Sequence, residues 1–297
     1  MKEKPTLEDS SQWLYDTIAN SKSGLAIAKI GSFELNAIIF YLIRKQTKEP
    51  YPEEIRLSIT VNNGLWEIED LTLDESIDMW AHSILKALAD MDGISPWNPM
   101  NPLEEMMIIR NCCPDAKQLD LLSLEPYYTK DKEYSLLMNK GAIAVISPFA
   151  KSIMAQWEKR DKLFPGHMWS KEQKLIPIQA FYGPYLNRFG GLSYPNEVLS
   201  KGPLAAVDYY VNEVKKSGAK YCFVGITAIA ILIVAELKKA GIIAIHTGGA
   251  TQIMFGVKGM RWKQMDFFRK LFNSEWVDPL PEETPTEAKR VEGGCFW

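Results

Sequence analysis

Residues 220–249 read KYCFVGITAIAILIVAELKKAGIIAIHTGG. In this stretch a long apolar run has one short apolar run before it and another after it. Residues 220–224 and 242–245 have the length of buried strands, and residues 227–239 have the length of a helix. Gly241 follows the helical part, where glycine commonly ends a helix. The uncharged run at 221–235 is too short to span a bilayer. This stretch therefore predicts a strand–helix–strand unit.

The same alternation continues toward both ends of the chain, which favours an α/β fold. Further strands are expected at residues 25–30, 106–110, 142–146 and 175–180. Further helices are expected at residues 33–44, 74–89, 149–161, 204–216 and 251–255, with Ser32 as the N-cap of the first. Residues 55–61 are interpreted as an extended run and the proline-rich residues 95–102 as a loop. We predict a Rossmann-like, mainly parallel sheet with helices on both faces.

One domain over residues 1–297 is expected, because no repeat or low-complexity linker divides the chain. Residues 276–297 are read as a C-terminal extension that is rich in proline and glutamate. Such a composition is typical of a disordered tail. The extension ends in Gly-Gly-Cys-Phe-Trp, however, and terminal aromatic side chains favour a surface on which to pack. We expect the extension to dock on the domain.

Composition and charge argue against several classes of protein. The 297 residues carry 34 basic and 37 acidic side chains, for a net charge of −3, and 46% of the residues are hydrophobic. This excludes disorder of the whole chain and argues against a nucleic-acid binder. The four cysteines form no Cys-x-x-Cys pair, which argues against a disulfide framework or a zinc ribbon. The polar first 20 residues do not resemble a secretory signal. A cytoplasmic protein without a transmembrane segment is expected.

Small and polar residues follow four of the predicted strands. In open α/β sheets, ligands bind beyond the carboxyl ends of the strands. We therefore expect a binding site built from residues at these strand ends. They are Gly31, Ser32, Glu34, Ser147, Gly225, His246, Gly248, Gly249, Thr251 and Gln252.

The segment His246–Thr251 has two interpretations. Glycine lets backbone N–H groups approach a ligand, and a helix N-terminus favours a phosphate. A tight turn with Thr251 as the helix cap explains the same residues more simply. The segment matches neither the dinucleotide fingerprint Gly-x-Gly-x-x-Gly nor a Walker loop.

Two ionisable residues stand at strand ends. Glu34 lies just inside a predicted helix that is otherwise apolar, where a carboxylate either stabilises the helix start or acts as a base or ligand anchor. His246 ends a buried strand, so it is either a core histidine or an accessible functional one. The residues alone leave both alternatives open.

Two loops add candidate binding residues. Lys258 and Arg261 lie in a glycine-containing loop with aromatic neighbours. They are either ordinary surface charges or cations that neutralise a diphosphate. Asn62 and Asn63, followed by Gly64, form either a simple turn or a pair of amides that contact a sugar or a base.

Residues 28–35 (AKIGSFEL) are similar to the Arg-Phe-Gly-Asp-Gly-Glu-Leu opening motif of GT-D-type glycosyltransferases. Residues 244–252 (AIHTGGATQ) and 255–262 (FGVKGMRW) resemble a branch of GT-D-like proteins found in bacterial polysaccharide loci and large DNA viruses. Residues 146–149 and 292–297 also resemble that branch. The resemblance thus spans nearly the full chain, and the histidine–glycine block is its most specific part.

This resemblance implies a glycosyltransferase that moves a sugar from a nucleoside diphosphate donor, with a UDP-sugar favoured, to a glycan hydroxyl. Glu34 matches the glutamate of the family's Asp-x-Glu element, which is associated with the donor and its divalent metal. Ser32 replaces the aspartate. Two carboxylates hold a hard cation better than one. The replacement therefore predicts a weakly held or absent Mn²⁺ or Mg²⁺, with Glu34 as its ligand.

Site roles follow from the resemblance and the strand ends together. Glu34 and His246 are the predicted catalytic residues. A noncatalytic nucleotide-sugar or glycan-binding protein is the main alternative. A methyltransferase is a third one, disfavoured because its glycine-rich first loop is not evident. The predicted substrate-binding residues are Gly31, Ser32, Asn62, Asn63, Ser147, Gly225, Gly248, Gly249, Thr251, Gln252, Lys258 and Arg261.

Overall fold

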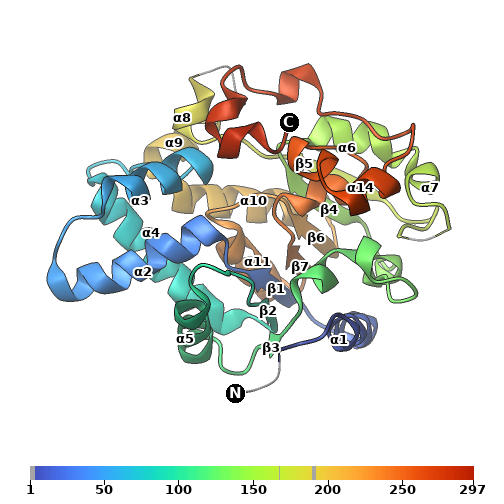
Figure 1. The fold of residues 1–297 in the computed structure, drawn as a ribbon, viewed down its shortest axis with the longest axis horizontal. Coiled ribbons are helices and arrows are strands. Elements are labelled where there is room, and N and C mark those ends of the chain that lie inside the picture. Colours follow the sequence, from blue (N-terminus) through green and yellow to red (C-terminus); the bar gives the residue numbers. More distant parts are fainter. Residues whose placement is uncertain (1–3, 167, 189–191) are drawn as a thin grey trace.

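A parallel sheet forms the centre of the molecule in the computed structural model, which describes residues 4–166, 168–188 and 192–297 (Figure 1). In the described chain, seven strands run in the order β3-β2-β1-β7-β6-β4-β5, and all neighbouring pairs are parallel. This confirms the predicted α/β, Rossmann-like fold. The strands are β1 (Leu25–Lys29), β2 (Gly93–Ser95), β3 (Lys117–Gln118), β4 (Ile143–Ser147), β5 (Leu175–Gln179), β6 (Tyr221–Val224) and β7 (Ile243–His246).

Helices cover both faces of the sheet, and each face has its own hydrophobic core. Alternate residues of a strand point to opposite faces, so Ala26 and Ala28 belong to one core and Leu25 and Ile27 to the other. The first core is packed by α2 (Ser32–Thr47), α4 (Leu73–Ala87), α10 (Pro203–Ser217) and α11 (Ala230–Lys239). The second is packed by α1 (Leu7–Asn20), α6 (Ala150–Trp157) and α7 (Arg160–Leu163). In Figure 1, α2 and α4 lie to the left and α1 to the right.

Most of the remaining helices are short connections between these elements. None of the helices in the described ranges has the length and apolar character needed to cross a membrane. The α-helices are α3 (Glu53–Leu57), α5 (Pro102–Cys112), α8 (Pro184–Asn187), α9 (Asn196–Lys201), α12 (Ala250–Met254), α13 (Met260–Lys263) and α14 (Asp266–Leu271). A π-helical turn, η1, spans Ser58–Asn62. The 3₁₀ turns are η2 (Leu88–Asp90), η3 (Leu121–Leu124), η4 (Pro126–Tyr128), η5 (Tyr134–Leu137), η6 (Pro281–Glu283), η7 (Ala288–Arg290) and η8 (Glu292–Gly294).

Two segments predicted as extended are helical. Residues 55–61 belong to α3 and η1, and their buried residues, Ile55 and Ile59, are four apart. Residues 106–110 belong to α5, which buries Glu105, Ile108 and Ile109 on one side. Spacings of three and four place side chains on the same face of a helix. In both segments the burial of that face decides the structure.

Two helix starts also differ from the predictions. Gly31 is the N-cap of α2, and Ser32 is the first helical residue. The helix expected at residues 149–161 is divided into α6 and α7, with Lys159 as the N-cap of α7. Ser32 is therefore free of the capping role, and its hydroxyl donates to the Asn98 side chain at 2.7 Å.

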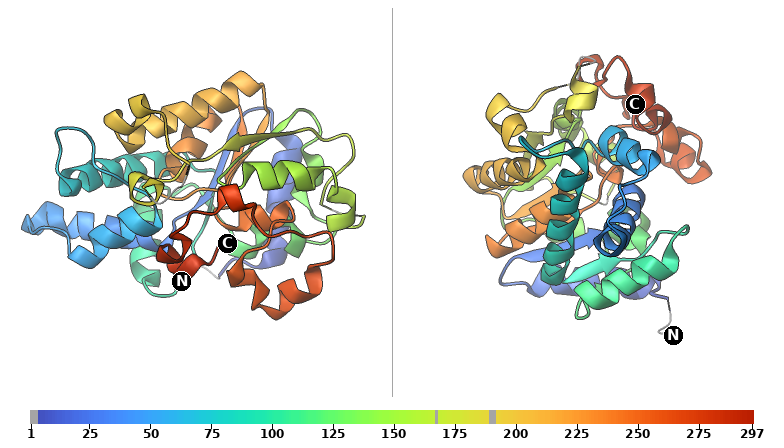
Figure 2. Two further views of the ribbon diagram at one scale, coloured as in Figure 1. Left: turned by 90° about the horizontal axis from the view of Figure 1, so that it is seen from above. Right: turned by 90° about the vertical axis from the view of Figure 1, so that its left-hand side faces the viewer.

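The C-terminal extension packs on the domain, as expected, and Figure 2 shows it in red along the outside of the other elements. Glu283, which is fully buried, fastens it. The Glu283 carboxylate accepts hydrogen bonds from the backbone N–H groups of Lys151 (2.7 Å) and Ser152 at the start of α6, and from the Ser152 hydroxyl. The Glu283 carbonyl accepts from Tyr182 Oη and Trp297 Nε1, each at 2.9 Å.

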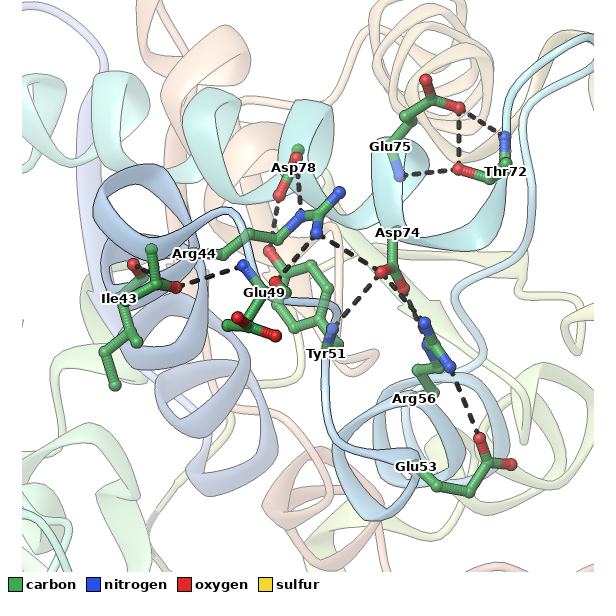
Figure 3. Close-up of polar contacts among 11 residues, drawn as sticks. Ile43, Arg44, Glu49, Tyr51, Glu53, Arg56, Thr72, Asp74, Glu75 and Asp78 are labelled. Atoms are coloured by element: carbon green, nitrogen blue, oxygen red, sulfur yellow. Dashed lines mark hydrogen bonds and ion pairs between the residues drawn. The ribbon is translucent and has the colours of Figure 1, made fainter.

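A polar network holds the chain around α3 against α4 (Figure 3). Arg56 donates to both carboxylate oxygens of Asp74, at 2.7 and 3.0 Å, and the Tyr51 backbone N–H donates to the same group at 3.3 Å. Arg44 and the Tyr51 hydroxyl donate to Asp78 at 3.2 and 2.8 Å.

Replacement of Asp74 should destabilise the protein in a pH-dependent way. We expect Asp74→Ala to lower the free energy of unfolding by about 1–3 kcal/mol, because Arg56 and the Tyr51 N–H lose their acceptor. Hydrogen bonds from Arg56 lower the pKa of Asp74 below its ordinary value. The contribution of Asp74 is therefore complete above the unfolded-state pKa and is lost as the pH falls through the folded-state pKa. Urea unfolding at pH 7 and pH 3 measures both effects.

Glu53→Ala is the matched control for Asp74→Ala. Glu53 also pairs with Arg56, at 3.7 Å, but its side chain is 72% exposed. Exposed ion pairs contribute little to stability. Equal destabilisation by the two variants, or an Asp74→Ala effect that does not decrease between pH 7 and pH 3, would contradict the assignment.

Candidate functional site

A cleft of about 130 Å³ opens beyond the carboxyl ends of β4, β5, β6 and β7. Strands β4 and β6 are neighbours, yet the chain continues from β4 to β5 on one side and from β6 to β7 on the other. The connections therefore diverge between β4 and β6. Ligands of open α/β sheets bind at such a switch point, so the cleft occupies the position that this fold favours for a ligand.

Aromatic and uncharged polar residues form the walls of this cleft. Among the described residues that line it there is no Asp, Glu, Lys, Arg or His. Its aromatic residues are Trp66, Phe149, Phe181, Tyr182, Tyr194, Phe296 and Trp297. Seven of the predicted binding residues line it: Asn62, Asn63, Ser147, Gly225, Gly248, Gly249 and Gln252.

Two residues of these walls, Asn63 and Gln252, have buried amide oxygens, Oδ1 and Oε1, without a hydrogen-bond partner among the described residues. The amide nitrogens are used within the protein. Gln252 Nε2 donates to the carbonyls of Lys258 (2.8 Å) and Phe296 (3.0 Å), and the Asn63 side chain donates to Glu34. A buried acceptor without a donor costs free energy. Each oxygen is thus an acceptor that the described protein atoms leave unused.

Glu34 lies beside the cleft, behind Asn63, and its side chain is buried. The carboxyl group folds back over the N-cap of α2, where a Cβ atom at Gly31 would collide with it. A larger residue at position 31 would require the Glu34 carboxyl group to move. Burial raises the pKa of Glu34, while hydrogen bonds from its own backbone N–H and from Asn63 oppose the rise.

Lys29, the last residue of β1, is a site residue that the sequence analysis missed. Its ammonium group lies 4.9 Å from the centroid of the Trp97 ring, and a Cβ atom at Gly248 would be 3.6 Å from Lys29 Nζ. Burial lowers the pKa of Lys29, and the charges of Glu125 and Glu34 oppose this. The sequence feature that could have identified Lys29 is its position as a lone charged residue near the end of the apolar run at residues 25–30.

His246 ends β7 with both ring nitrogens against backbone carbonyls. Nδ1 lies 3.1 Å from the Lys29 carbonyl and Nε2 lies 3.1 Å from the Ile226 carbonyl. Burial, aided by the positive charge of Lys29, lowers the pKa of His246 to about 3, so the ring is neutral at pH 7. A neutral imidazole donates from one nitrogen only. These contacts join the ends of β1, β6 and β7; the predicted catalytic role of His246 stays a prediction.

Two other predicted residues, Ser32 and Thr251, do not line the cleft. Ser32 lies at the start of α2 with its hydroxyl on Asn98. Thr251 lies inside α12 rather than at its cap, and its hydroxyl is 2.5 Å from the Thr247 hydroxyl. Both hydroxyl groups are thus engaged within the protein. Their substrate-binding roles stay predictions.

The two predicted cations also lie outside the cleft lining. Arg261 forms an ion pair with Glu292 of the C-terminal extension and lies 3.0 Å from Cys295 Sγ. It is close enough to Lys29 for its charge to lower the pKa of that lysine further. The backbone N–H of Lys258 donates to the Val277 carbonyl at 2.7 Å. Arg261, rather than Lys258, belongs with Lys29 in a charged cluster beside the cleft.

The C-terminal extension supplies one wall of the cleft, through Val291, Phe296 and Trp297. A Cβ atom at Gly249 would lie 2.5 Å from the Phe296 ring, so the extension approaches the backbone closely there. The sequence analysis expected docking of this segment but assigned it no site residue. The two aromatic residues at its end, Phe296 and Trp297, were the sequence feature that could have indicated a role in the site.

Within the part of the chain that the structure describes, no three His, Cys, Asp or Glu side chains are grouped so that they could hold a metal ion. The Glu34 carboxylate is engaged by Asn63 and by its own backbone N–H. These residues do not form a ligand set for a hard cation, which prefers several oxygen ligands. The metal role of Glu34 stays a prediction, and no step proposed below depends on it.

Comparisons with known proteins found no matching protein-family model and no matching curated protein. Two solved structures are similar to the chain. One, described as a selenomethionine-substituted structure of domain of unknown function 1792, is 12% identical with a TM-score of 0.36, over 96% of this chain and 99% of that one. The other, glutamate racemase from Francisella tularensis subsp. tularensis SCHU S4 in complex with D-glutamate, is 14% identical with a TM-score of 0.25, over 91% and 94%. Similarities this weak assign neither a family nor an activity to the chain.

Proposed function

We propose that the protein is a glycosyltransferase that moves a sugar from a nucleoside diphosphate, with UDP favoured, to a hydroxyl group of a glycan. The observation that carries this proposal is the pair of unpartnered amide oxygens, Asn63 Oδ1 and Gln252 Oε1, in an aromatic cleft at the switch point of a parallel sheet. Ligand pockets are commonly apolar with a few placed polar groups. The similarity of residues 28–35 and 244–262 to GT-D sequences favours the same reaction.

The charged cluster beside the cleft suits the diphosphate of the donor. Lys29 lies next to Gly248, which lines the cleft, and Arg261 lies close to Lys29. A leaving diphosphate carries negative charge that two cations stabilise, and groups already held in place do this best. We assign this role to Lys29 and Arg261; Lys258 lies just before α13, the helix that contains Arg261.

Glu34 is the proposed general base. In the reaction, the acceptor hydroxyl oxygen forms a bond to the anomeric carbon, and the bond from that carbon to the diphosphate oxygen breaks. The hydroxyl proton passes to the Glu34 carboxylate. Glu34 contacts Asn63 of the cleft, and burial raises its pKa toward the range in which a carboxylate accepts a proton more readily. His246 positions the ends of β1 and β7 in this scheme.

A noncatalytic glycan-binding protein is the second candidate. It is favoured by the absence of any Asp, Glu, Lys, Arg or His among the described residues that line the cleft. Such walls bind a neutral ligand without reacting with it. The two candidates differ in whether a nucleoside diphosphate is released.

Release of UDP or GDP tests the proposal directly. The purified chain is incubated with a panel of UDP- and GDP-sugars, with and without glycan acceptors, and the nucleotide is separated and quantified. We expect release that depends on the acceptor. A thermal-shift screen with UDP, GDP, CMP and S-adenosylmethionine, each with and without Mn²⁺, reports binding to the native state. Stabilisation by S-adenosylmethionine alone, or no release from any donor, would refute the transferase.

A further inference from the structure

We propose that the cleft holds a neutral pyranose ring, so that the sugar rather than the nucleobase or the diphosphate occupies the space between Asn63 and Gln252. This assignment deepens the proposed function and rests on it for the class of ligand. It follows from three properties of the cleft: its lack of charge, its two unpaired acceptors and its size.

The lack of charged side chains disfavours a phosphate in the cleft. No side chain among the described lining residues carries a formal charge at pH 7. Transfer of an anion from water into a cleft without charged side chains costs free energy, unless a cation or several hydrogen-bond donors compensate that cost. Lys29 and Arg261 do not line the cleft. The diphosphate therefore belongs in the charged cluster, and a neutral part of the substrate belongs in the cleft.

The unpaired acceptors suit a ligand with several donors. Asn63 and Gln252 use their amide nitrogens within the protein, so each offers only its oxygen. A pyranose carries hydroxyl groups around its whole ring, and each can donate to such an oxygen. Uracil has one N–H group in a nucleoside and can satisfy one of the two oxygens. A sugar ring fits the pair better than the base of the favoured donor.

The size and walls of the cleft suit a single ring. An apolar cavity of about 150 Å³ takes up benzene, and this cleft has about 130 Å³. The Trp297 ring packs against two other aromatic rings of the wall. Its centroid lies 6.2 Å from that of Phe149 and 6.1 Å from that of Tyr182. The C–H groups on the face of a pyranose pack against such rings, while its hydroxyl groups at the edge reach the amide oxygens.

Saturation-transfer difference NMR with neutral probes tests the assignment. The probes are methyl glycosides of glucose, galactose, mannose and N-acetylglucosamine, together with uridine, guanosine and UDP. We expect at least one methyl glycoside to bind. Gln252→Met keeps the length of the side chain but removes the acceptor, and Trp297→Leu removes the aromatic wall. Each should weaken glycoside binding at least tenfold and change UDP binding less than twofold. Gln264→Met, on the surface, is the matched control and should change neither.

The outcomes separate this assignment from the proposed function. If no methyl glycoside binds, or if the two variants weaken uridine or guanosine binding instead, the sugar assignment is overturned, even where nucleotide-sugar turnover is observed. If a glycoside binds and both variants weaken it, the assignment stands, even where no donor is turned over and the transferase proposal fails. Thermal melting of each variant confirms that it is folded; if one unfolds, the other decides.

Discussion

Glu34→Gln is expected to reduce the rate of sugar transfer by about 10²–10⁴-fold, the usual contribution of a general base. Glutamine has the same shape, and its side-chain oxygen still accepts the hydrogen bond that Asn63 donates to Glu34. It cannot take up the proton of the acceptor hydroxyl. The variant should therefore keep its fold and its affinity for the donor while losing turnover, which steady-state kinetics with the acceptor at saturation measures.

The pH profile makes this prediction more specific. A general base acts only when ionised, so the rate of the wild type should fall as the pH falls through the pKa of Glu34, which burial holds above its ordinary value. Glu34→Gln should lack this acid limb. Glu54→Gln, on the exposed side of α3, is the matched control and should behave as the wild type. Unchanged turnover in Glu34→Gln would remove Glu34 from the mechanism.

The sheet could be predicted from the sequence because its strands are short, apolar and closely followed by helices. Residues 220–249 contain β6, α11 and β7 in the predicted order, with small differences at their ends. The segment at residues 55–61 was mispredicted because its pattern of apolar residues fits a strand as well as a helix. The network around Asp74, a residue of α4, and the burial of Ile55 and Ile59 in the first core select the helix, and both depend on residues outside the segment.

The site was only partly predictable, for a physical reason. Residues that follow strands must meet at one edge of a parallel sheet, so the grouping of Ser147, Gly225 and Gly248 follows from the fold. The Asn62–Asn63 loop and the C-terminal aromatic pair reach the same cleft through tertiary packing alone. Contacts that form through tertiary packing cannot be predicted from local sequence patterns. The role of Lys29 depends on Trp97 and Gly248, which come from two other strand ends.

Glu283→Ala is expected to cause the largest loss of stability, about 2–4 kcal/mol in the free energy of unfolding. The change removes the acceptor for the partly buried backbone N–H of Lys151 and for the buried backbone N–H and hydroxyl of Ser152, at the start of α6. Loss of a helix cap costs about 0.5–2 kcal/mol, and each buried donor left without a partner adds to that cost. Urea unfolding followed by circular dichroism measures the change.

The effect of Glu283→Ala should also reach the cleft, because the Glu283 carbonyl accepts hydrogen bonds from Tyr182 and Trp297, which both line it. Once the carboxylate no longer holds the extension against α6, the Trp297 wall loses its support, and binding of methyl glycosides should weaken along with stability.

Glu282→Ala is the matched control, since Glu282 is adjacent, 52% exposed and paired with Lys151 at 3.6 Å. An exposed pair of this kind contributes little. If the two variants lose equal stability, the extension is not held by the Glu283 carboxylate. If Glu283→Ala is destabilised but binds glycosides as the wild type does, the Trp297 wall is supported by its aromatic contacts with Phe149 and Tyr182 rather than by this anchor.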